Sequence, residues 1–379
     1  MPPWTKEQEE LRAVIEDLGD ALSDGHATRD QLETFPAEQW KLLAGTGLFG
    51  LPIEEPYGGL GQDLLTTMFV LEGLGYSCRD AGLSFSASAQ IVSAGVPLQR
   101  FGHEELKKRH LPRIASGEAI TAHAITEPES GSDALSMRTT ARQDGDSYVL
   151  DGSKTFVTNG PVADLITVYA KTGAASGVGA ITAILVERDT PGLTIGHKIS
   201  KMGLRTSPFC ELHFDGCRVP ASNVIGRPGS GFWVFDYVMK REILCSFVIN
   251  IGEMQHRLER TIEYARTRRQ AAGPISSHQA VSHRIVDMKV RLETARLWLY
   301  ETARKVQLGR DTTIDVAVGK LLASTANVDS ASAALQIHGG YGYTTEYGIE
   351  QQLRDAIPSL IYSGTSDIQK NRIATMLGL

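Results

Sequence analysis

Residues 284–306 read RIVDMKVRLETARLWLYETARKV. Apolar or small side chains recur there at steps of three and four, and most positions between them carry charged groups. This spacing puts one apolar stripe on one face of a helix, so the segment predicts a long amphipathic helix that packs against other helices. The stripe consists of Ile285, Met288, Leu292, Ala295, Leu299, Thr302 and Val306.

A second helix is predicted directly after the first. Small and apolar side chains step by three and four from Ala317 to Leu335, and Gly339-Gly340 then supplies a C-terminal stop. Two such helices in succession predict a helical bundle. The first third of the chain is also predicted to be helical, at about residues 63–76, 86–101 and 103–116, after an N-terminal helix that carries Leu11, Ile15, Leu18 and Leu22.

The middle of the chain, residues 120–225, favours short strands. Compact apolar runs at 165–170 and 181–186 predict strands, and the run 148–150 followed by Asp151-Gly152 predicts a hairpin turn. The succession of helical, β-rich and helical parts predicts an α+β fold. Its middle unit is expected to be a small β-barrel or sandwich.

Composition argues against several classes of protein. The 379 residues carry 38 Lys and Arg against 44 Asp and Glu, a net charge of −6, without a basic stripe, so no nucleic-acid partner is expected. No apolar run reaches the roughly 18 residues of a membrane span. The four cysteines form no CxxC pair and are expected to be reduced, which favours a cytoplasmic protein. The histidines show no metal-ligand spacing, so no metal site is predicted.

The segment AITEPESGSD, residues 124–133, opens the β-rich region. Gly131 stands between the small hydroxyls of Ser130 and Ser132, so backbone amides there can approach an anionic group such as a phosphate. The same composition also fits a polar turn between two domains. The residues alone leave both interpretations open.

Three segments, taken in order, resemble signatures of the acyl-CoA dehydrogenase family. They are AITEPESGSD at 124–133, QIHGGYGY at 336–343 and IYSGTSDIQ at 361–369. The stretches between them are similar too, so the likeness covers nearly the whole chain. The likeness implies that the protein is an FAD-dependent oxidoreductase and that FAD lies between the middle and C-terminal domains. It also implies that the subunits form a homodimer or a homotetramer. The implied domains are an N-terminal helical domain at 1–120, a middle β-domain at 121–228 and a C-terminal four-helix bundle domain at 229–379.

The resemblance also implies which residues bind FAD. Some would meet the flavin ring or the pyrophosphate of the subunit's own cofactor: Thr126, Gly131, Ser132, Phe156, Thr158, Thr365 and Asp367. Others would reach the FAD of a neighbouring subunit: Arg268, Gln336 and Gly340. Phe156 stands where the family more often has Trp, a change between two aromatic residues.

The family reaction removes two hydrogens from an acyl thioester: a carboxylate takes the α-proton while hydride passes to flavin N5. In the commonest pattern the carboxylate is the Glu of IYEGT, where this chain has Ser363, a residue still expected beside the substrate. Other branches carry the Glu on the first helix of the C-terminal domain, and an ungapped count from Tyr264 places Glu242 there. Glu242 lies on a mostly apolar helix face, where desolvation makes a carboxylate a stronger base. Glu242 is therefore the predicted catalytic base.

Two departures from the family pattern bear on function. Ala271 and Ala272 replace the Phe and Gly of the family's RRQFG, which predicts altered packing around FAD or at the subunit contact. The variant YSGTSD with an alternative Glu is similar to a branch found in natural-product pathways (secondary metabolism). Members of that branch act on acyl groups held by a carrier protein rather than on free CoA. The electron acceptor would be a protein such as an electron-transfer flavoprotein.

Two other functions are compatible with the same residues. One is a flavin-dependent monooxygenase on the same fold, which would need no catalytic carboxylate. The other is a non-catalytic flavin-binding protein, which Ser363, Ala271 and Ile243, each a departure from the family pattern, would suit.

Overall fold

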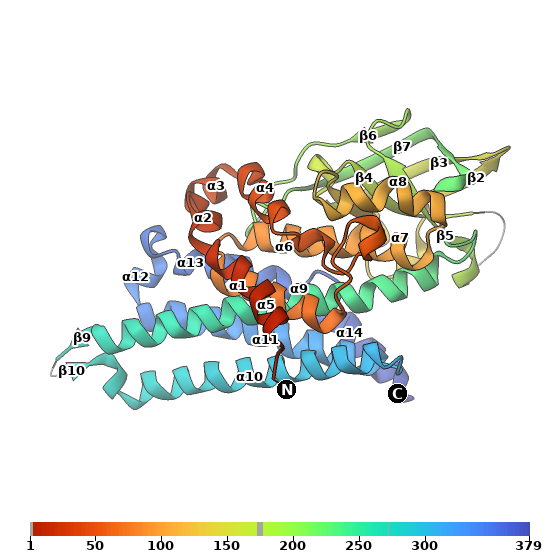
Figure 1. The fold of residues 1–379 in the computed structure, drawn as a ribbon. Coiled ribbons are helices and arrows are strands. Elements are labelled where there is room, and N and C mark those ends of the chain that lie inside the picture. Colours follow the sequence, from red (N-terminus) through yellow and green to blue (C-terminus); the bar gives the residue numbers. More distant parts are fainter. Residues whose placement is uncertain (1–2, 173–176, 272) are drawn as a thin grey trace.

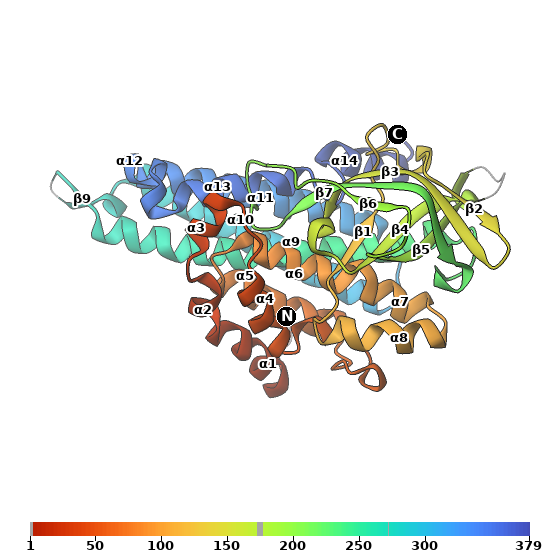
Figure 2. The same ribbon diagram turned by 90° about the horizontal axis from the view of Figure 1, so that it is seen from above.

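Long helices run along the molecule, and the strands gather at one end of them, as Figures 1 and 2 show. The structure, a computed structural model, describes residues 3–172, 177–271 and 273–379. A helical part comes first along the chain, a β-sheet second and another helical part last. This order confirms the predicted α+β architecture.

The N-terminal part is helical from its first turn. The helix predicted at 63–76 is confirmed as α5, which begins after Asp63 because the carboxylate of that residue accepts a hydrogen bond from the amide of Thr66 at 2.7 Å. The helix predicted at 86–101 begins earlier, because Asp80 caps it, and a π-helical turn at Ile91–Gly95 interrupts it. The α-helices of this part are α1 (Lys6–Asp17), α2 (Gly19–Ser23), α3 (His26–Leu32), α4 (Ala37–Gly45), α5 (Leu64–Ser77), α6 (Ala81–Gln90), α7 (Val96–Phe101) and α8 (Glu104–Ala115).

The strands of the middle part form one mixed sheet in the order β6-β7-β3-β2-β4-β5-β8, and β1 pairs in parallel with β4 off this path. The antiparallel pairing of β3 with β7 and of β4 with β5 makes up most of the sheet. The strands are β1 (Thr121–Ala124), β2 (Thr140–Asp144), β3 (Ser147–Thr158), β4 (Leu165–Lys171), β5 (Ile181–Glu187), β6 (Leu193–Ile195), β7 (Phe209–Pro220) and β8 (Val224–Ile225).

The turn predicted at Asp151-Gly152 is wrong, because β3 continues through both residues. Gly152 has a φ of 141° at an irregularity between β3 and β7, and a Cβ there would lie 2.7 Å from the Thr139 hydroxyl oxygen. The Asp151 carboxylate accepts a hydrogen bond from the amide of Gly216 at 2.8 Å instead of closing a turn. The β2–β3 turn lies at Gly145, whose φ is 63°.

The C-terminal part is the predicted helical bundle. The helices expected from the periodicity are confirmed within α10 and α11, and α11 ends at His338, where Gly339 has a φ of 60°. The elements are α9 (Gly231–Thr267), β9 (Arg269–Gln270), β10 (Gly273–Pro274), α10 (Gln279–Gln307), α11 (Thr313–His338), α12 (Gly340–Tyr343), α13 (Ile349–Ala356) and α14 (Ser366–Met376).

Helix α9 joins the sheet to the bundle. Val234 and Val238 in its first turns are buried in one cluster with Tyr169 of β4 and Ile181 of β5. Later turns are buried against α5, α10 and α11, with Phe247 fully covered. Residues in the first third of α9 therefore face the seam between the sheet and the helices.

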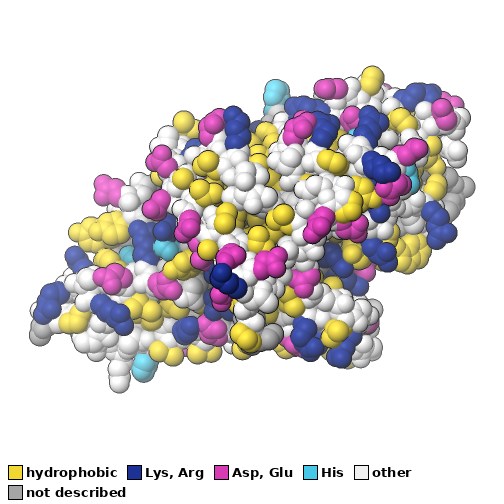
Figure 3. All heavy atoms as spheres, viewed as in Figure 1, with side chains coloured by type: hydrophobic (Ala, Val, Ile, Leu, Met, Phe, Trp, Pro, Cys, Tyr) yellow, Lys and Arg dark blue, Asp and Glu magenta, His cyan; other side chains and the backbone are white. Residues whose placement is uncertain are grey.

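The surface mixes charges of both signs. On the face shown in Figure 3, Lys and Arg side chains lie among Asp and Glu side chains, so no area of a single sign dominates it. Across the three described ranges, no helix is both long and apolar enough to cross a lipid bilayer.

Candidate active site

Glu242 of α9 and Ser363, far apart in the sequence, meet in the structure. The Ser363 hydroxyl donates a hydrogen bond to Oε1 of Glu242 at 2.7 Å. The Glu242 side chain is 13% exposed, and its neighbours on the same helix face, Cys245 and Ser246, are buried. The hydroxyl at position 363 thus contacts a carboxylate that another element supplies.

An unusual backbone conformation brings Ser363 to this position. Its φ is 56°, in the left-handed region that residues with a side chain seldom adopt, and Gly364 follows with a φ of 89°. The Gln369 amide holds the turn by donating hydrogen bonds to the carbonyls of Ser363 and Gly364 at 3.1 and 3.4 Å. Thr365 then caps α14 by accepting a hydrogen bond from the amide of Ile368 at 3.3 Å.

His123 of β1 faces the other oxygen of Glu242. Its Nε2 lies 3.2 Å from Glu242 Oε2, and its side chain is 17% exposed. Its Nδ1 is buried and has no hydrogen-bond partner among the residues that the structure describes. The two carboxylate oxygens of Glu242 therefore have different neighbours, a hydroxyl and an imidazole.

Tyr169 of β4 completes the surroundings of Glu242. Burial raises the pKa of Tyr169 well above its usual value, and the nearby Glu242 charge raises it further. The Tyr169 hydroxyl is buried without a partner in the described part of the chain. It also borders a small hollow of about 200 Å³, shared by Ser132, Phe235 and Arg372, so this hollow adjoins the site.

The loop that follows β1 is tied to the sheet by a buried ion pair. Nζ of Lys154, on β3, donates to Oε1 of Glu127 at 2.8 Å and to the Ile125 carbonyl at 3.0 Å. Burial lowers the pKa of Lys154 to about 8, while the Glu127 carboxylate opposes that shift. The Thr155 amide donates to the carbonyl of Thr126 at 2.8 Å. These contacts hold Thr126 beside β3, the strand that carries Phe156 and Thr158.

Phe156 is an exposed aromatic residue in a strained backbone conformation. Its φ is 55°, its side chain is 60% exposed, and its ring meets Phe209 edge-on at 5.6 Å. A Cβ added to Gly131 would have only Thr126 Cγ2 nearby, at 3.9 Å, so the backbone there is open. An exposed ring on β3 and an open backbone in the loop that is bonded to β3 suit a flat cofactor that carries phosphates, such as FAD.

Three of the predicted FAD residues lie elsewhere. Arg268 follows the C-terminal end of α9, where its guanidinium lies 5.1 Å from the ring of Tyr341. Gln336 is near the end of α11 and Gly340 begins α12. Figure 1 shows β9, β10 and α12 at the end of the helices away from the sheet. The structure therefore separates Arg268, Gln336 and Gly340 from Glu242. Ala272, whose effect on FAD binding the sequence left open, is outside the described residues.

Several residues of this region did not emerge as site residues from the sequence. From the sequence, His123 is a candidate only for metal binding, which its spacing does not favour, and Tyr169 belongs to an apolar strand. Lys154 and Glu127 gave no signal, because their pairing joins residues 27 positions apart. His123 lies three residues before Thr126, so its nearness to the AITEPESGSD segment was the one available sign.

Comparisons with known proteins identify the family of the chain. Models of the acyl-CoA dehydrogenase family match in succession: the N-terminal domain at residues 5–118, the middle domain at 122–217 and the C-terminal domain at 229–378. The chain is 42% identical over 346 residues to an L-prolyl-[peptidyl-carrier protein] dehydrogenase of Pseudomonas fluorescens. The alignment covers 91% of this chain and 91% of the Pseudomonas protein.

Solved structures of other proteins are similar to this chain over its whole length. The prolyl acyl carrier protein oxidase AnaB is similar with a TM-score of 0.97 and 40% identity, covering 100% of both chains. A structure of PigA with FAD and proline is similar with a TM-score of 0.97 and 38% identity, covering 100% of this chain and 99% of PigA.

The chain therefore belongs to the acyl-CoA dehydrogenase family. It is an oxidoreductase that binds FAD and dehydrogenates acyl thioesters between the α- and β-carbons.

Proposed function

We propose that the substrate is a small aminoacyl group, of the prolyl type, held as a thioester on the phosphopantetheine arm of a carrier protein, and that Glu242 removes its α-proton. The names of the relatives support the carrier and the prolyl group, since the Pseudomonas protein is called a prolyl-carrier-protein dehydrogenase and the PigA structure contains proline. The contact between Ser363 and Glu242 supports the base.

That contact carries the proposal. Position 363 is where the commonest family pattern has its carboxylate, and here a hydroxyl occupies it and donates to Glu242 at 2.7 Å. This contact supports the proposal that the carboxylate of α9 takes the role that the family's usual carboxylate has. The Ser363 hydrogen bond restrains Oε1 of the carboxylate, and a proton-transfer group needs such positioning. Oε2 has no hydrogen-bond partner among the described residues and lies 3.2 Å from His123 Nε2.

The surrounding residues have distinct proposed roles. Phe156 and Thr158 lie at the flavin face, and the loop with Gly131 and Ser132, together with Thr365 and Asp367, takes the pyrophosphate. When bound, FAD supplies the acceptor for the hydride that leaves the β-carbon. The hollow beside Tyr169 and Arg372 is the path of the thioester arm. Arg268, Gln336 and Gly340 serve the FAD of a second subunit.

The cell compartment, the assembly and the electron acceptor are part of the same proposal. Cys78, Cys210, Cys217 and Cys245 are buried free thiols, which suits a cytoplasmic enzyme. The separation of Arg268 from the Glu242 region supports a homodimer or homotetramer. An electron-transfer flavoprotein is the proposed acceptor of the electrons.

An anaerobic titration tests this function. Prolyl carrier protein is expected to bleach the flavin absorbance near about 450 nm. Free prolyl-CoA is expected to bleach it at a rate lower by at least about tenfold, the difference that about 1.4 kcal/mol of lost binding produces. Equal rates with both thioesters would contradict a carrier-bound substrate. No bleaching by any thioester, with rapid reoxidation by oxygen after chemical reduction, would favour a monooxygenase instead.

Replacing His123 by Phe is expected to lower the rate constant of flavin reduction by about tenfold, because the Glu242 carboxylate loses its neighbour at Oε2 and can rotate. His123→Gln places an amide nitrogen near the position of Nε2 and is expected to retain most of the rate. Stopped-flow absorbance at saturating substrate measures both variants. A His123→Phe enzyme with normal FAD content and an unchanged rate would exclude a role for His123 in holding the base.

A further inference from the structure

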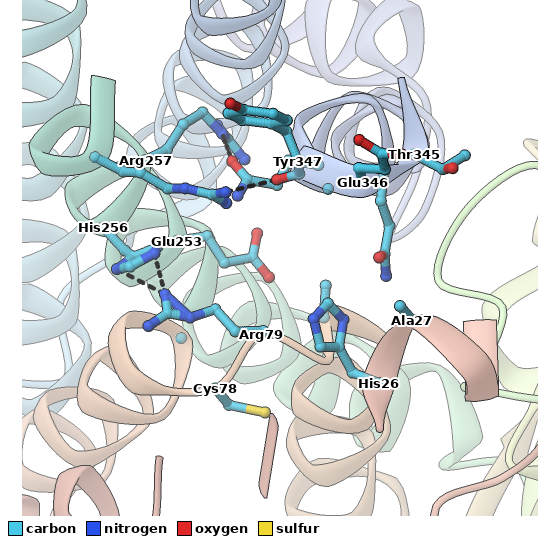
Figure 4. Close-up of a pocket in the computed structure, with 16 residues that line it drawn as sticks. His26, Ala27, Cys78, Arg79, Glu253, His256, Arg257, Thr345, Glu346 and Tyr347 are labelled. Atoms are coloured by element: carbon cyan, nitrogen blue, oxygen red, sulfur yellow. Dashed lines mark hydrogen bonds between the residues drawn. The ribbon is translucent and has the colours of Figure 1, made fainter. Parts of the chain in front are cut away.

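A hollow of about 370 Å³ lies away from Glu242, which is not among its lining residues. It lies between α3, the junction of α5 and α6, the second half of α9, and residues 345–352. Figure 4 shows side chains from these elements converging on one space, with Glu253 and His26 pointing into it from opposite sides. The proposed function uses none of these residues.

Three arginines line this hollow: Arg79, Arg257 and Arg260. Within the described ranges, none of them has a carboxylate oxygen within 4.0 Å. Their hydrogen-bond partners are neutral instead. Arg257 donates to Gln352 Oε1 at 2.9 Å and Asn327 Oδ1 at 3.0 Å, Arg260 donates to the Tyr347 carbonyl at 2.6 Å, and Arg79 contacts the His256 ring.

The positive charge of the hollow exceeds its negative charge. Its only acidic lining residues within the described ranges are Glu253 and Glu346. Burial raises the pKa of Glu253 to about 7, so this carboxylate is partly neutral at physiological pH. Burial also lowers the pKa of Arg79 and Arg260, and for Arg260 the charge of Arg79 adds to the effect. Arg79 and Arg260 are half-buried and lose part of their hydration, and within the described ranges neither has a carboxylate oxygen within 4.0 Å.

A buried cation without a counter-ion costs free energy that a bound anion would offset. Guanidinium groups bind carboxylate and phosphate oxygens in a bidentate manner, and each can direct two parallel N–H groups at one anion. His26 adds a neutral partner, because burial lowers its pKa and its Nδ1 is buried without a partner in the described part of the chain.

We propose that this hollow is a binding site for a small anion with carboxylate or phosphate oxygens, held chiefly by Arg79 and Arg260. This inference goes beyond the proposed function and does not depend on Glu242 being the base. The site is nevertheless connected to the catalytic region. The Tyr362 hydroxyl donates to Asn250 Oδ1 at 2.9 Å, and Asn250 donates to Glu253 Oε2 at 3.2 Å. Tyr362 directly precedes Ser363, so an anion beside Glu253 lies one chain of hydrogen bonds from the residue that holds Glu242.

Calorimetric titration of the FAD-loaded protein with inorganic phosphate, and separately with succinate, tests the proposal. Potassium chloride at matched ionic strength is the blank. Saturable binding of at least one anion is expected, weakened at least tenfold in Arg79→Gln and in Arg260→Gln. Arg142→Gln changes an exposed arginine of β2 and should bind like the wild type. Tighter binding of phosphate would indicate a phosphate ester as the natural ligand, and tighter binding of succinate a carboxylate.

Further variants keep the test decisive if Arg79→Gln folds poorly. Arg79→Lys retains the charge and is expected to bind the anion more weakly than the wild type but measurably. FAD content reports folding for every variant. Absence of saturable binding, or equal binding by the wild type and both glutamine variants, would overturn the proposal. The proposal would also be overturned if the wild type bound no anion and Arg79→Gln differed from the wild type in sedimentation mass. An acidic side chain of a second copy of the chain would then occupy the hollow.

Discussion

Glu242→Gln is expected to reduce the rate constant of flavin reduction by about 10³-fold, within the range that removal of a general base produces. The amide cannot accept the α-proton, but it has nearly the same shape and can still accept the Ser363 hydrogen bond. FAD content and substrate binding should therefore change little. Anaerobic stopped-flow absorbance, with the carrier-bound thioester at saturating concentration, measures the effect.

A matched control separates this effect from a general change in charge. Glu263 is an exposed carboxylate on the same helix, α9, and Glu263→Gln should leave the rate constant unchanged. A Glu242→Gln enzyme that binds FAD and reduces it at the wild-type rate would show that another group removes the proton. The dehydrogenase activity itself would then still stand, since family membership does not depend on this residue.

Lys154→Met is expected to lower the free energy of unfolding by about 3–5 kcal/mol, the usual cost of removing one partner of a buried ion pair. The Lys154 side chain is fully buried and that of Glu127 is 7% exposed, so the carboxylate would lose its charged partner away from water. The loop that carries Thr126 would also lose its two contacts with the Lys154 side chain, while the backbone hydrogen bond from Thr155 to Thr126 would remain. We therefore expect weaker retention of FAD as well.

Denaturant unfolding and FAD content measure the effects of Lys154→Met. Lys171→Met, at the end of β4, changes a half-buried lysine that forms no ion pair with any described residue, and it should cost far less. Adding Glu127→Gln to Lys154→Met is expected to restore part of the stability, because it removes the unpaired carboxylate. A single Lys154→Met variant as stable as the wild type would show that the ion pair does not stabilise the loop.

Local periodicity was sufficient to predict two helices of the bundle, α10 and α11, because residues three and four apart share a face whatever their partners are. The stripe from Ile285 to Val306 lies within α10 for this reason. The turn predicted at Asp151-Gly152 failed because the same two residues also suit an irregularity within a strand. The contacts with Thr139 and Gly216 favour the irregularity within the strand, and the local sequence does not reveal these contacts.

The candidate site also combines residues that the sequence identified with contacts that only the tertiary structure shows. Family motifs identified Glu242 and Ser363 as residues of interest, and their 2.7 Å contact joins positions 121 apart. That contact could not be read from spacing along one helix. The place of His123 depends on β1 pairing with β4 and facing α9, so it required the tertiary structure. The arginines of the larger hollow come from α9 and from the α5–α6 junction, and no local pattern links them.

The length of helix α9 can be compared with the length of the cofactor. The helix is 37 residues long, and Arg268 follows Glu242 by 26 positions, a rise of about 39 Å at about 1.5 Å per residue. One dinucleotide cannot extend that far, so under the proposed assignments no single chain can surround its own FAD completely. Subunit association and cofactor retention then become one coupled equilibrium. Dilution alone should release FAD, and added FAD should hold the subunits together, so the ratio of cofactor to chain reports the state of assembly.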